Sequence, residues 1–231
     1  MDNPGARQGV HSTGGRVMGA RRDALIAALY GPVGWPRARR VVERLRGHLP
    51  PGGSLLDLGA GTGHTGVLLA RQGWAVTLAD APPHPGAWGQ RLIAQPAARH
   101  LARQAGLRRV LSPGPLPFPD AHFDTVLLAF VLHHCPDPPG VLREAARVAR
   151  RRVLVLEDVT GDGQRPGRLA RVLDALVNLE AGHPHAQRSH ADWLRLFGAL
   201  HLTVHARERW TSREIGVPTG HVLYDLRPAG P

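Results

Sequence analysis

The sequence LLDLGAGTGHTG at residues 55–66 decides the fold. It joins an apolar run, of the kind that forms a buried strand, to a segment with a glycine at almost every second position. Glycines let the backbone turn sharply and approach a ligand with no Cβ in the way, and a helix that follows offers unpaired N–H groups to an anion. The stretch therefore predicts a strand, a turn and a helix that wrap a nucleoside-like cofactor, which favours an enzyme.

Two cofactors compete for this turn. Residues 61–66 fit the G-x-G-x-x-G dinucleotide fingerprint, with Asp80 near the expected acidic position. A dinucleotide site has its first glycine directly at the end of the strand, whereas here the expected strand at residues 54–58 runs into Gly59. The register is therefore acidic-x-Gly-x-Gly-x-Gly, which resembles motif I of class I S-adenosylmethionine-dependent methyltransferases.

That resemblance implies which residues hold S-adenosylmethionine. The methionine end of the cofactor would lie against the backbone of the turn, and the helix after Gly63 would start near its carboxylate. Asp57 would hold the turn and reach the amino group of the cofactor through water. The residues expected around this end of the cofactor are Asp57, Gly59, Ala60, Gly61 and Gly63.

Asp80 ends a second expected strand at residues 74–80. A carboxylate can accept hydrogen bonds from both ribose hydroxyls, and such charge-assisted bonds contribute about 1.5 to 3 kcal/mol each. An Asp that follows a strand can also be the N-cap of a helix. Because motif I lies one strand earlier, the ribose role is favoured.

A family resemblance becomes specific at residues 116–124, LPFPDAHFD, and at residues 125–134, TVLLAFVLHH. With Pro-Asp-Pro at residues 136–138, these segments resemble the methyltransferase type 11 domain, and the match covers roughly residues 50–160. The resemblance implies an α/β fold. We expect a doubly wound, seven-stranded, mostly parallel Rossmann-like sheet with an antiparallel final strand and a helical N-terminal lid.

The chain departs from the family at the adenine end of the cofactor. Members usually have an acidic residue four positions before the Leu-Pro-Phe turn, where this chain has Ser112. The Ser112 hydroxyl, backbone groups and the apolar wall around Leu116 are expected to hold adenine instead, with Phe130 as a further cofactor contact. Cofactor affinity would then be weaker than is usual in the family.

We expect one domain in the 231 residues. Residues 1–22 are expected to be a disordered leader, 23–49 a helical lid, 50–160 the cofactor-binding core, and 161–231 acceptor-side helices and closing strands. The lid would consist of two short helices, one capped by Asp23 and one starting near Pro36. Ser189 is expected to cap a helix near residues 191–200 that packs Trp193 and Phe197 against the sheet.

His133 and His134 lie where the fourth strand delivers side chains to the cleft. An amine or hydroxyl acceptor must lose a proton, so either imidazole is a candidate base or acceptor-binding group. It is equally consistent with the sequence that one packs under the loop and the other is solvated. Glu157 and Asp158, at the end of the fifth strand, either bind acceptor or cap the following loop. No spacing of ligands indicates a metal site.

The composition limits the possible functions but does not single one out. The net charge of +11 would suit nucleic acid, but every basic residue is Arg, which also indicates a genome-wide composition bias. One cysteine excludes an internal disulfide, and no apolar run approaches a transmembrane or signal segment, so we expect a cytoplasmic protein with no membrane partner. The favoured function is methyl transfer from S-adenosylmethionine to a small molecule. The alternatives are an RNA acceptor, or an inactive S-adenosylmethionine-binding partner subunit.

Overall fold

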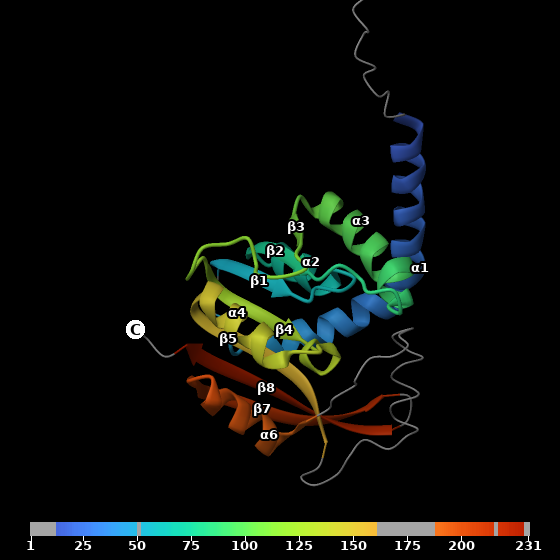
Figure 1. Ribbon diagram of the computed structural model, residues 1–231. Helices are drawn as coiled ribbons and strands as arrows, with labels where there is room; N and C mark the ends of the chain where they lie inside the picture. The colour runs from blue at the N-terminus through green and yellow to red at the C-terminus, as the bar shows by residue number, and fades with distance from the viewer. Residues whose placement is uncertain (1–12, 50–51, 161–187, 215–216, 229–231) are drawn as a thin grey trace, which may run out of the picture.

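A mixed sheet forms the centre of this computed structural model, which describes residues 13–49, 52–160, 188–214 and 217–228 (Figure 1). The strands are β1 (Ser54–Leu58), β2 (Ala75–Asp80), β3 (Arg108–Leu111), β4 (Phe123–Ala129), β5 (Ala149–Thr160), β6 (Arg188–Ser189), β7 (Leu202–Glu214) and β8 (Val217–Pro228). Their order is β3-β2-β1-β4-β5-β8-β7, and the two-residue β6 lies beside β5. Strands β1 to β5 pair in parallel, and β8 is antiparallel to β5 and β7. The expected mostly parallel sheet is confirmed, with β6 as an eighth strand.

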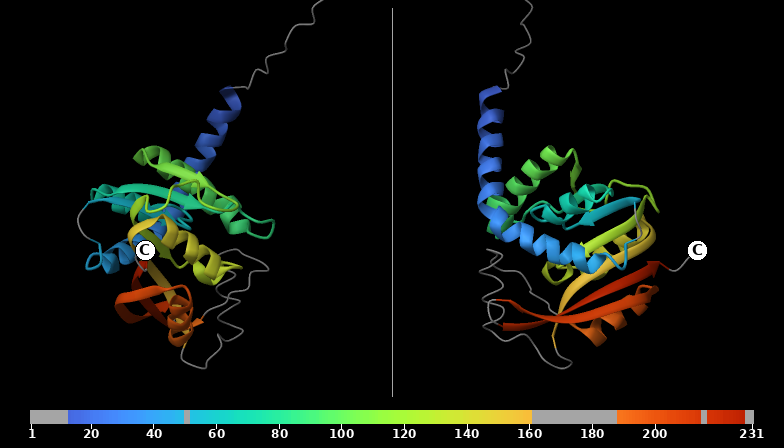
Figure 2. Two further views of the ribbon diagram at one scale, coloured as in Figure 1. Left: turned by 60° about the vertical axis from the view of Figure 1, so that its left-hand side comes forward. Right: turned by 180° about the vertical axis from the view of Figure 1, so that it is seen from behind.

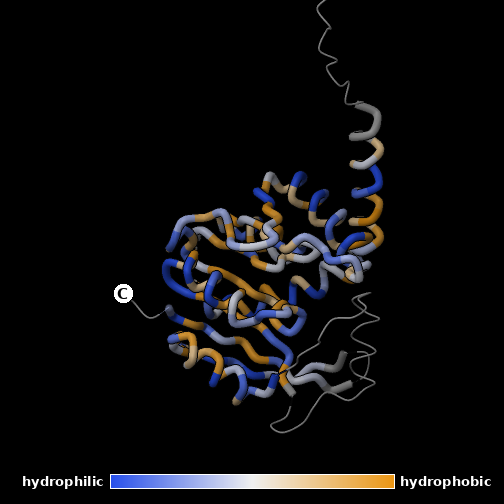
Figure 3. Tube along the Cα trace, in the orientation of Figure 1, coloured by the Kyte–Doolittle hydropathy of each residue, from blue (hydrophilic) through white to orange (hydrophobic). Residues whose placement is uncertain are grey.

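Helices cover both faces of the sheet (Figure 2). The helices are α1 (Thr13–Leu45), α2 (His64–Arg71), α3 (Gln95–Ala105), α4 (Pro138–Val148) and α6 (His190–Ala199), with a π-helical turn at Gln90–Ala94 and a 3₁₀ turn at Leu132–His134. Helices α4 and α6 pack on one face, whereas α1, α2 and α3 pack on the other. Residues 126–129 of β4 pack alternately against the two faces, which explains the apolar run in this strand (Figure 3).

The N-terminal region differs from the expected leader and two short helices. One helix, α1, begins at Thr13, so the boundary at residue 22 is wrong for residues 13–22. Pro32 and Pro36 lie inside α1, and the helix bends so that its first half points away from the sheet and its second half crosses the sheet behind β4 (Figure 1). Asp23 does not start a helix. It is buried and accepts a bond of 2.8 Å from Arg99 of α3, which anchors α1.

The C-terminal elements behave as expected where the structure describes them. Ser189 caps α6 in a capping box with Asp192, and Trp193 and Phe197 are fully buried against the sheet. Residues 161–187 of the expected acceptor-side region lie outside the described residues. Within the described parts of the chain, no helix combines the length and the hydropathy needed to cross a bilayer.

Candidate active site

The glycine turn after β1 lies at the carboxyl edge of the sheet. Gly59, Gly61 and Gly63 have φ angles of 78°, 53° and 81°, in the left-handed region that favours glycine. A Cβ at Gly59 would lie 2.5 Å from Val131, and one at Gly63 would lie 3.2 Å from Leu78. A Cβ at Gly61 would meet nothing closer than the Gly59 carbonyl oxygen at 4.0 Å. Packing therefore requires Gly59 and Gly63, while the missing side chain of Gly61 leaves open space beside the turn.

The turn is tied to β2, and a buried carboxyl lies under it. The backbone N–H groups of Gly59 and Ala60 both donate to the Ala79 carbonyl oxygen, at 2.8 and 3.1 Å. Asp57 is 2% exposed, and its Oδ2 has no hydrogen-bond partner among the described residues. Burial first, and then the charge of Asp80, raises the pKa of Asp57 to about 7, while the backbone N–H of Gly66, which is not aligned for a full hydrogen bond, lowers it. A buried carboxyl oxygen in need of a partner fits a cationic ligand group bound at the turn.

Asp80 ends β2 as predicted, and its carboxylate is partly exposed. Its Oδ1 accepts from the N–H of Ala81 at 2.9 Å, and its Oδ2 lies 3.5 Å from Nε2 of Gln95. The alternative role as a helix N-cap is wrong, because the next helical turn begins only at Gln90. Arg109 contacts Gln95 and brings a positive charge near Asp80. The Asp80 carboxylate thus lies at the strand end where a ribose role would require it.

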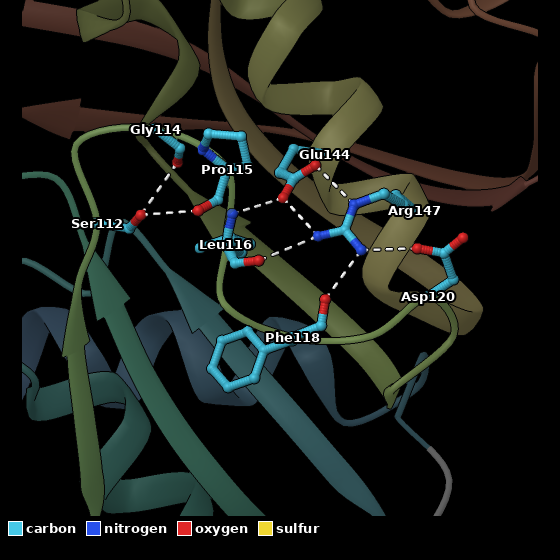
Figure 4. A network of polar contacts seen from close by, with 8 residues as sticks. All are labelled: Ser112, Gly114, Pro115, Leu116, Phe118, Asp120, Glu144 and Arg147. Carbon is cyan, nitrogen blue, oxygen red and sulfur yellow. Dashed lines mark hydrogen bonds and ion pairs between the residues drawn. The ribbon is translucent and has the colours of Figure 1, made fainter.

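Ser112 follows β3 in the loop that leads to Leu116 (Figure 4). Its hydroxyl lies 2.8 Å from the Pro115 carbonyl oxygen and 3.2 Å from that of Gly114. Its proton is therefore donated within its own loop, and only oxygen lone pairs remain for a ligand. Leu116 is buried. The contact of both residues with adenine stays a prediction.

An arginine of α4 holds the Leu-Pro-Phe-Pro-Asp turn (Figure 4). Arg147 donates to the carbonyl oxygens of Leu116 and Phe118, at 3.1 and 2.9 Å, and to the carboxylate of Asp120 at 2.7 Å. Glu144, held by Arg147, accepts from the N–H of Leu116 at 2.6 Å, and the Arg147 hydrogen bond lowers the pKa of Glu144. The role of Glu144 and Arg147 in holding this turn was not predicted from the sequence. Their opposite charges three residues apart on a helix were the available signal.

The turn after β4 is organised by a buried glutamate. Glu157 is 0% exposed, and its Oε1 accepts from the N–H groups of Val131 and Leu132 at 3.1 and 2.7 Å. Its Oε2 lies 2.6 Å from Nδ1 of His133, which is itself buried. In the contacts that the structure describes, Glu157 holds the turn after β4, a role that was not predicted, while acceptor binding and capping of the following loop stay predictions. The ring of His134 lies 4.0 Å from that of His133 and is partly buried. A catalytic role for either histidine stays a prediction.

A further cluster of polar side chains lies at this edge of the sheet, and it was not predicted from the sequence. His221 of β8 has its Nδ1 2.7 Å from Oδ1 of Asp158 and its Nε2 2.6 Å from the hydroxyl of Ser212. Its ring also contacts Phe130, with centroids 5.8 Å apart, and stacks on Trp210 at 5.3 Å. Phe130 itself has a φ of 58° and donates its N–H to the Leu156 carbonyl oxygen. Asp158 was considered as an acceptor ligand or a loop cap, and the structure pairs it with His221.

The family pattern described as a methyltransferase domain matches residues 35–206 of this chain, which is more than half of it. The chain belongs to this family. The expected class, S-adenosylmethionine-dependent methyltransferases with a Rossmann-like sheet, is thereby confirmed.

Curated relatives of this methyltransferase domain act on different small molecules, by their names. The demethylmenaquinone methyltransferase of Tropheryma whipplei (strain Twist) is 36% identical over 112 residues, which are 48% of this chain and 43% of that protein. The 27-O-demethylrifamycin SV methyltransferase of Amycolatopsis mediterranei is 28% identical over 187 residues, 74% of this chain and 65% of that protein. The matched part thus spans less than half the length of the first relative.

Solved structures share the fold at low identity. The Burkholderia thailandensis 1,6-didemethyltoxoflavin-N1-methyltransferase, with bound 1,6-didemethyltoxoflavin and S-adenosylhomocysteine, has a TM-score of 0.59 at 20% identity and covers 100% of this chain and 94% of that chain. The 4+2 cyclase SpnF has a TM-score of 0.61 at 19% identity and covers 83% of this chain and 81% of that one. One fold therefore carries more than one chemistry, and the acceptor must be argued from the site.

Proposed function

We propose that this protein transfers a methyl group from S-adenosylmethionine to a small-molecule acceptor. The observation that carries the proposal is the pairing of Gly61, whose absent side chain leaves open space, with the unpartnered buried Oδ2 of Asp57 next to the same turn. S-adenosylmethionine brings an ammonium and a sulfonium cation, and either charge favours ionised Asp57.

Three groups of residues would hold the cofactor. The turn at residues 59–63 would receive the methionine end, and Asp57 would receive its ammonium group through water. Asp80 would accept from the ribose hydroxyls. Ser112, Leu116 and Phe130 would surround the adenosine. When bound, S-adenosylmethionine supplies an electrophilic methyl group on sulfur.

The protein would then contribute to catalysis mostly by aligning the methyl donor and the acceptor. The acceptor atom must approach the methyl carbon in line with the bond that breaks, and holding two reactants in that geometry can supply roughly 7 to 11 kcal/mol of the barrier. The turns after β1 and β4 touch through Gly59 and Val131, so the donor site and the histidine-bearing turn share one edge of the sheet. His133 and His134 remain candidates for contact with the acceptor.

Two observations bear on whether the acceptor is a small molecule or RNA. Arg99, Arg147 and Arg152 are engaged with Asp23, Glu144 and Asp225, so part of the positive charge serves the fold. The names of the relatives above also describe small acceptors. RNA binding that survives moderate salt would favour the alternative, because simple charge attraction weakens steeply with salt.

Calorimetry with S-adenosylmethionine and S-adenosylhomocysteine tests the donor site. We expect both to bind the unmodified protein, and Asp80→Ala to weaken binding about tenfold or more, because a charged contact to the ribose is lost. Glu43→Ala, at an exposed position of α1, is the control and should bind normally. A binding signal on titration with NADH, with none from S-adenosylmethionine or S-adenosylhomocysteine, would overturn the proposal. Cofactor binding without transfer to any of a broad panel of acceptors would favour the inactive partner subunit.

A further inference from the structure

Three polar side chains from three strands form a hydrogen-bonded chain that no step above uses. Asp158, His221 and Ser212 lie on β5, β8 and β7, and the two distances that join them are 2.7 and 2.6 Å. A carboxylate only accepts, so Nδ1 of His221 carries the proton that it donates to Asp158. Nε2 of the neutral ring is then an acceptor, and the Ser212 hydroxyl donates to it. The histidine is 3% exposed, whereas Ser212 is partly exposed.

The strand directions place this cluster at the carboxyl edge. Strand β8 is antiparallel to both β5 and β7, so the start of β8 meets the ends of the other two. Register pairs Asp158 with His221, and His221 with Trp210, two residues before Ser212. The ring contact between His221 and Phe130 connects the cluster to the turn after β4. The Ser212 hydroxyl therefore belongs to a cluster that reaches, through His221 and Phe130, the turn after β4 that borders the expected donor site.

Aromatic and cationic groups surround the cluster. Phe130 and Trp210 flank the His221 ring. From α1, the guanidinium of Arg37 lies 5.5 Å from the centre of Phe130, and that of Arg44 lies 4.9 Å from the centre of Trp210. Aromatic side chains next to the cluster suit an aromatic acceptor, and the guanidinium of Arg37 beside Phe130 would favour an oxyanion that develops on it, whereas Arg44 is already paired with Glu208 at 2.7 Å.

We propose that Ser212, His221 and Asp158 form a proton relay that deprotonates a phenolic hydroxyl of the acceptor, which rests on the proposed methyl transfer. The phenol oxygen attacks the methyl carbon, an O–C bond forms, and the C–S bond breaks with its electron pair left on sulfur. The phenolic proton passes to Ser212 Oγ as the Ser212 proton passes to His221 Nε2. Asp158 stabilises the resulting imidazolium, which later releases its proton to solvent. Ser212 touches the acceptor, and His221 and Asp158 act through it.

The pair of His133 and Glu157 is less suited to this task. Glu157 is already the acceptor for two backbone N–H groups as well as for His133, and it is completely buried. Its carboxylate holds the shape of the turn, so proton movement on His133 would disturb that turn. In the contacts that the structure describes, Asp158 and His221 bind no backbone N–H group, and the cluster ends on Ser212, which is a partly exposed residue.

Phenols of different acidity test the relay. The probes are 4-methoxyphenol, which keeps its proton at pH 8, and 4-nitrophenol, which is largely ionised there, with labelled S-adenosylmethionine as donor. We expect Ser212→Ala and His221→Gln to lose about 100-fold or more in kcat on 4-methoxyphenol, the range for general-base catalysis, with little loss on 4-nitrophenol. Ser212→Thr keeps the hydroxyl and should restore activity. Thr211→Ala, an exposed neighbour on β7, should match the unmodified protein on both phenols.

Calorimetry with S-adenosylmethionine on the same proteins separates the two proposals. Unchanged donor affinity together with the acidity-dependent loss supports the relay. An equal loss on both phenols indicates a structural role and overturns it, as does full activity in Ser212→Ala. If the unmodified protein binds the donor but methylates neither phenol, the relay to a phenol is overturned while the proposed function stands. If the donor itself does not bind, the proposed function fails.

Discussion

Replacing Asp57 by asparagine should make the ligand-free protein more stable at alkaline pH, and the effect should vanish toward acid. The carboxyl is buried, and its pKa is raised from 3.8 to about 7. A folded-state pKa above the unfolded value means that the group contributes stability below pH 3.8, and that this contribution is lost as the pH rises through 7. Asparagine has a similar shape and does not ionise, so the variant lacks this loss.

The size of the effect follows from the shift. Roughly three pKa units at 1.36 kcal/mol each give about 4 kcal/mol over the whole titration. Between pH 5 and pH 8 the same linkage gives a change of about 2.5 kcal/mol in the stability difference between Asp57→Asn and the unmodified protein. Most of this change should fall between pH 5 and pH 7, where folded Asp57 still mostly holds its proton and the unfolded chain has already released it.

Urea unfolding at pH 5, 6, 7 and 8, followed by tryptophan fluorescence, measures the difference. Every other titrating group is common to the two proteins, so their pH effects cancel. Glu43→Gln, which removes an exposed carboxyl, should show no such trend. Parallel profiles for Asp57→Asn and the unmodified protein would refute the reasoning, because they would mean that Asp57 ionises as easily when folded as when unfolded.

Three further outcomes are expected. Gly61→Val should abolish the calorimetric signal of S-adenosylmethionine at a strain cost of about 1 to 2 kcal/mol, because its Cβ would enter the open space beside the turn; normal binding would contradict this. Arg147→Ala should lower the free energy of unfolding in urea by about 2 kcal/mol, because Glu144 and two carbonyl oxygens lose their donor; an unchanged midpoint would show that the turn holds itself. Burial lowers the pKa of His64 to about 4, so stability should fall as the pH drops from 6.5 to 4, and His64→Gln should flatten that fall by roughly 2 to 3 kcal/mol. A fall of equal size in the variant would assign it to other groups.

The centre of the fold was predictable because its signals are local. Residues 55–66 contain a strand, a turn and a helix start within one short segment, and the structure places β1 and α2 there. The capping box at Ser189 is equally local. The start of α1 was not predictable in this way. Its first turns are anchored through Asp23 to Arg99, which lies 76 residues away in the chain.

The same contrast between local signals and distant contacts explains which site residues could be predicted. The glycines and Asp80 stand at strand ends that the sequence marks directly, so their places were predicted correctly. The sequence gives no comparable mark for Ser212, His221 and Asp158, which meet only because an antiparallel strand returns beside β5 with one particular register. A shift of that register by one residue would turn His221 to the opposite face. Pattern analysis finds residues near one another in sequence, whereas this cluster depends on how two distant segments pair.

The contacts of the arginines bear on how the net positive charge of the chain should be interpreted. Arg147 bridges two carbonyl oxygens and two carboxylates, and Arg99 donates to both oxygens of Asp23 through two of its nitrogens. Only the planar guanidinium, with its five donors, can make such multidentate contacts, and a lysine could not replace it. Arginines fixed in this way cannot also track a phosphate backbone. Each such ion pair cancels one positive and one negative charge, so it leaves the net charge of +11 unchanged. The salt dependence of RNA binding, and not the number of paired arginines, must therefore decide the RNA alternative.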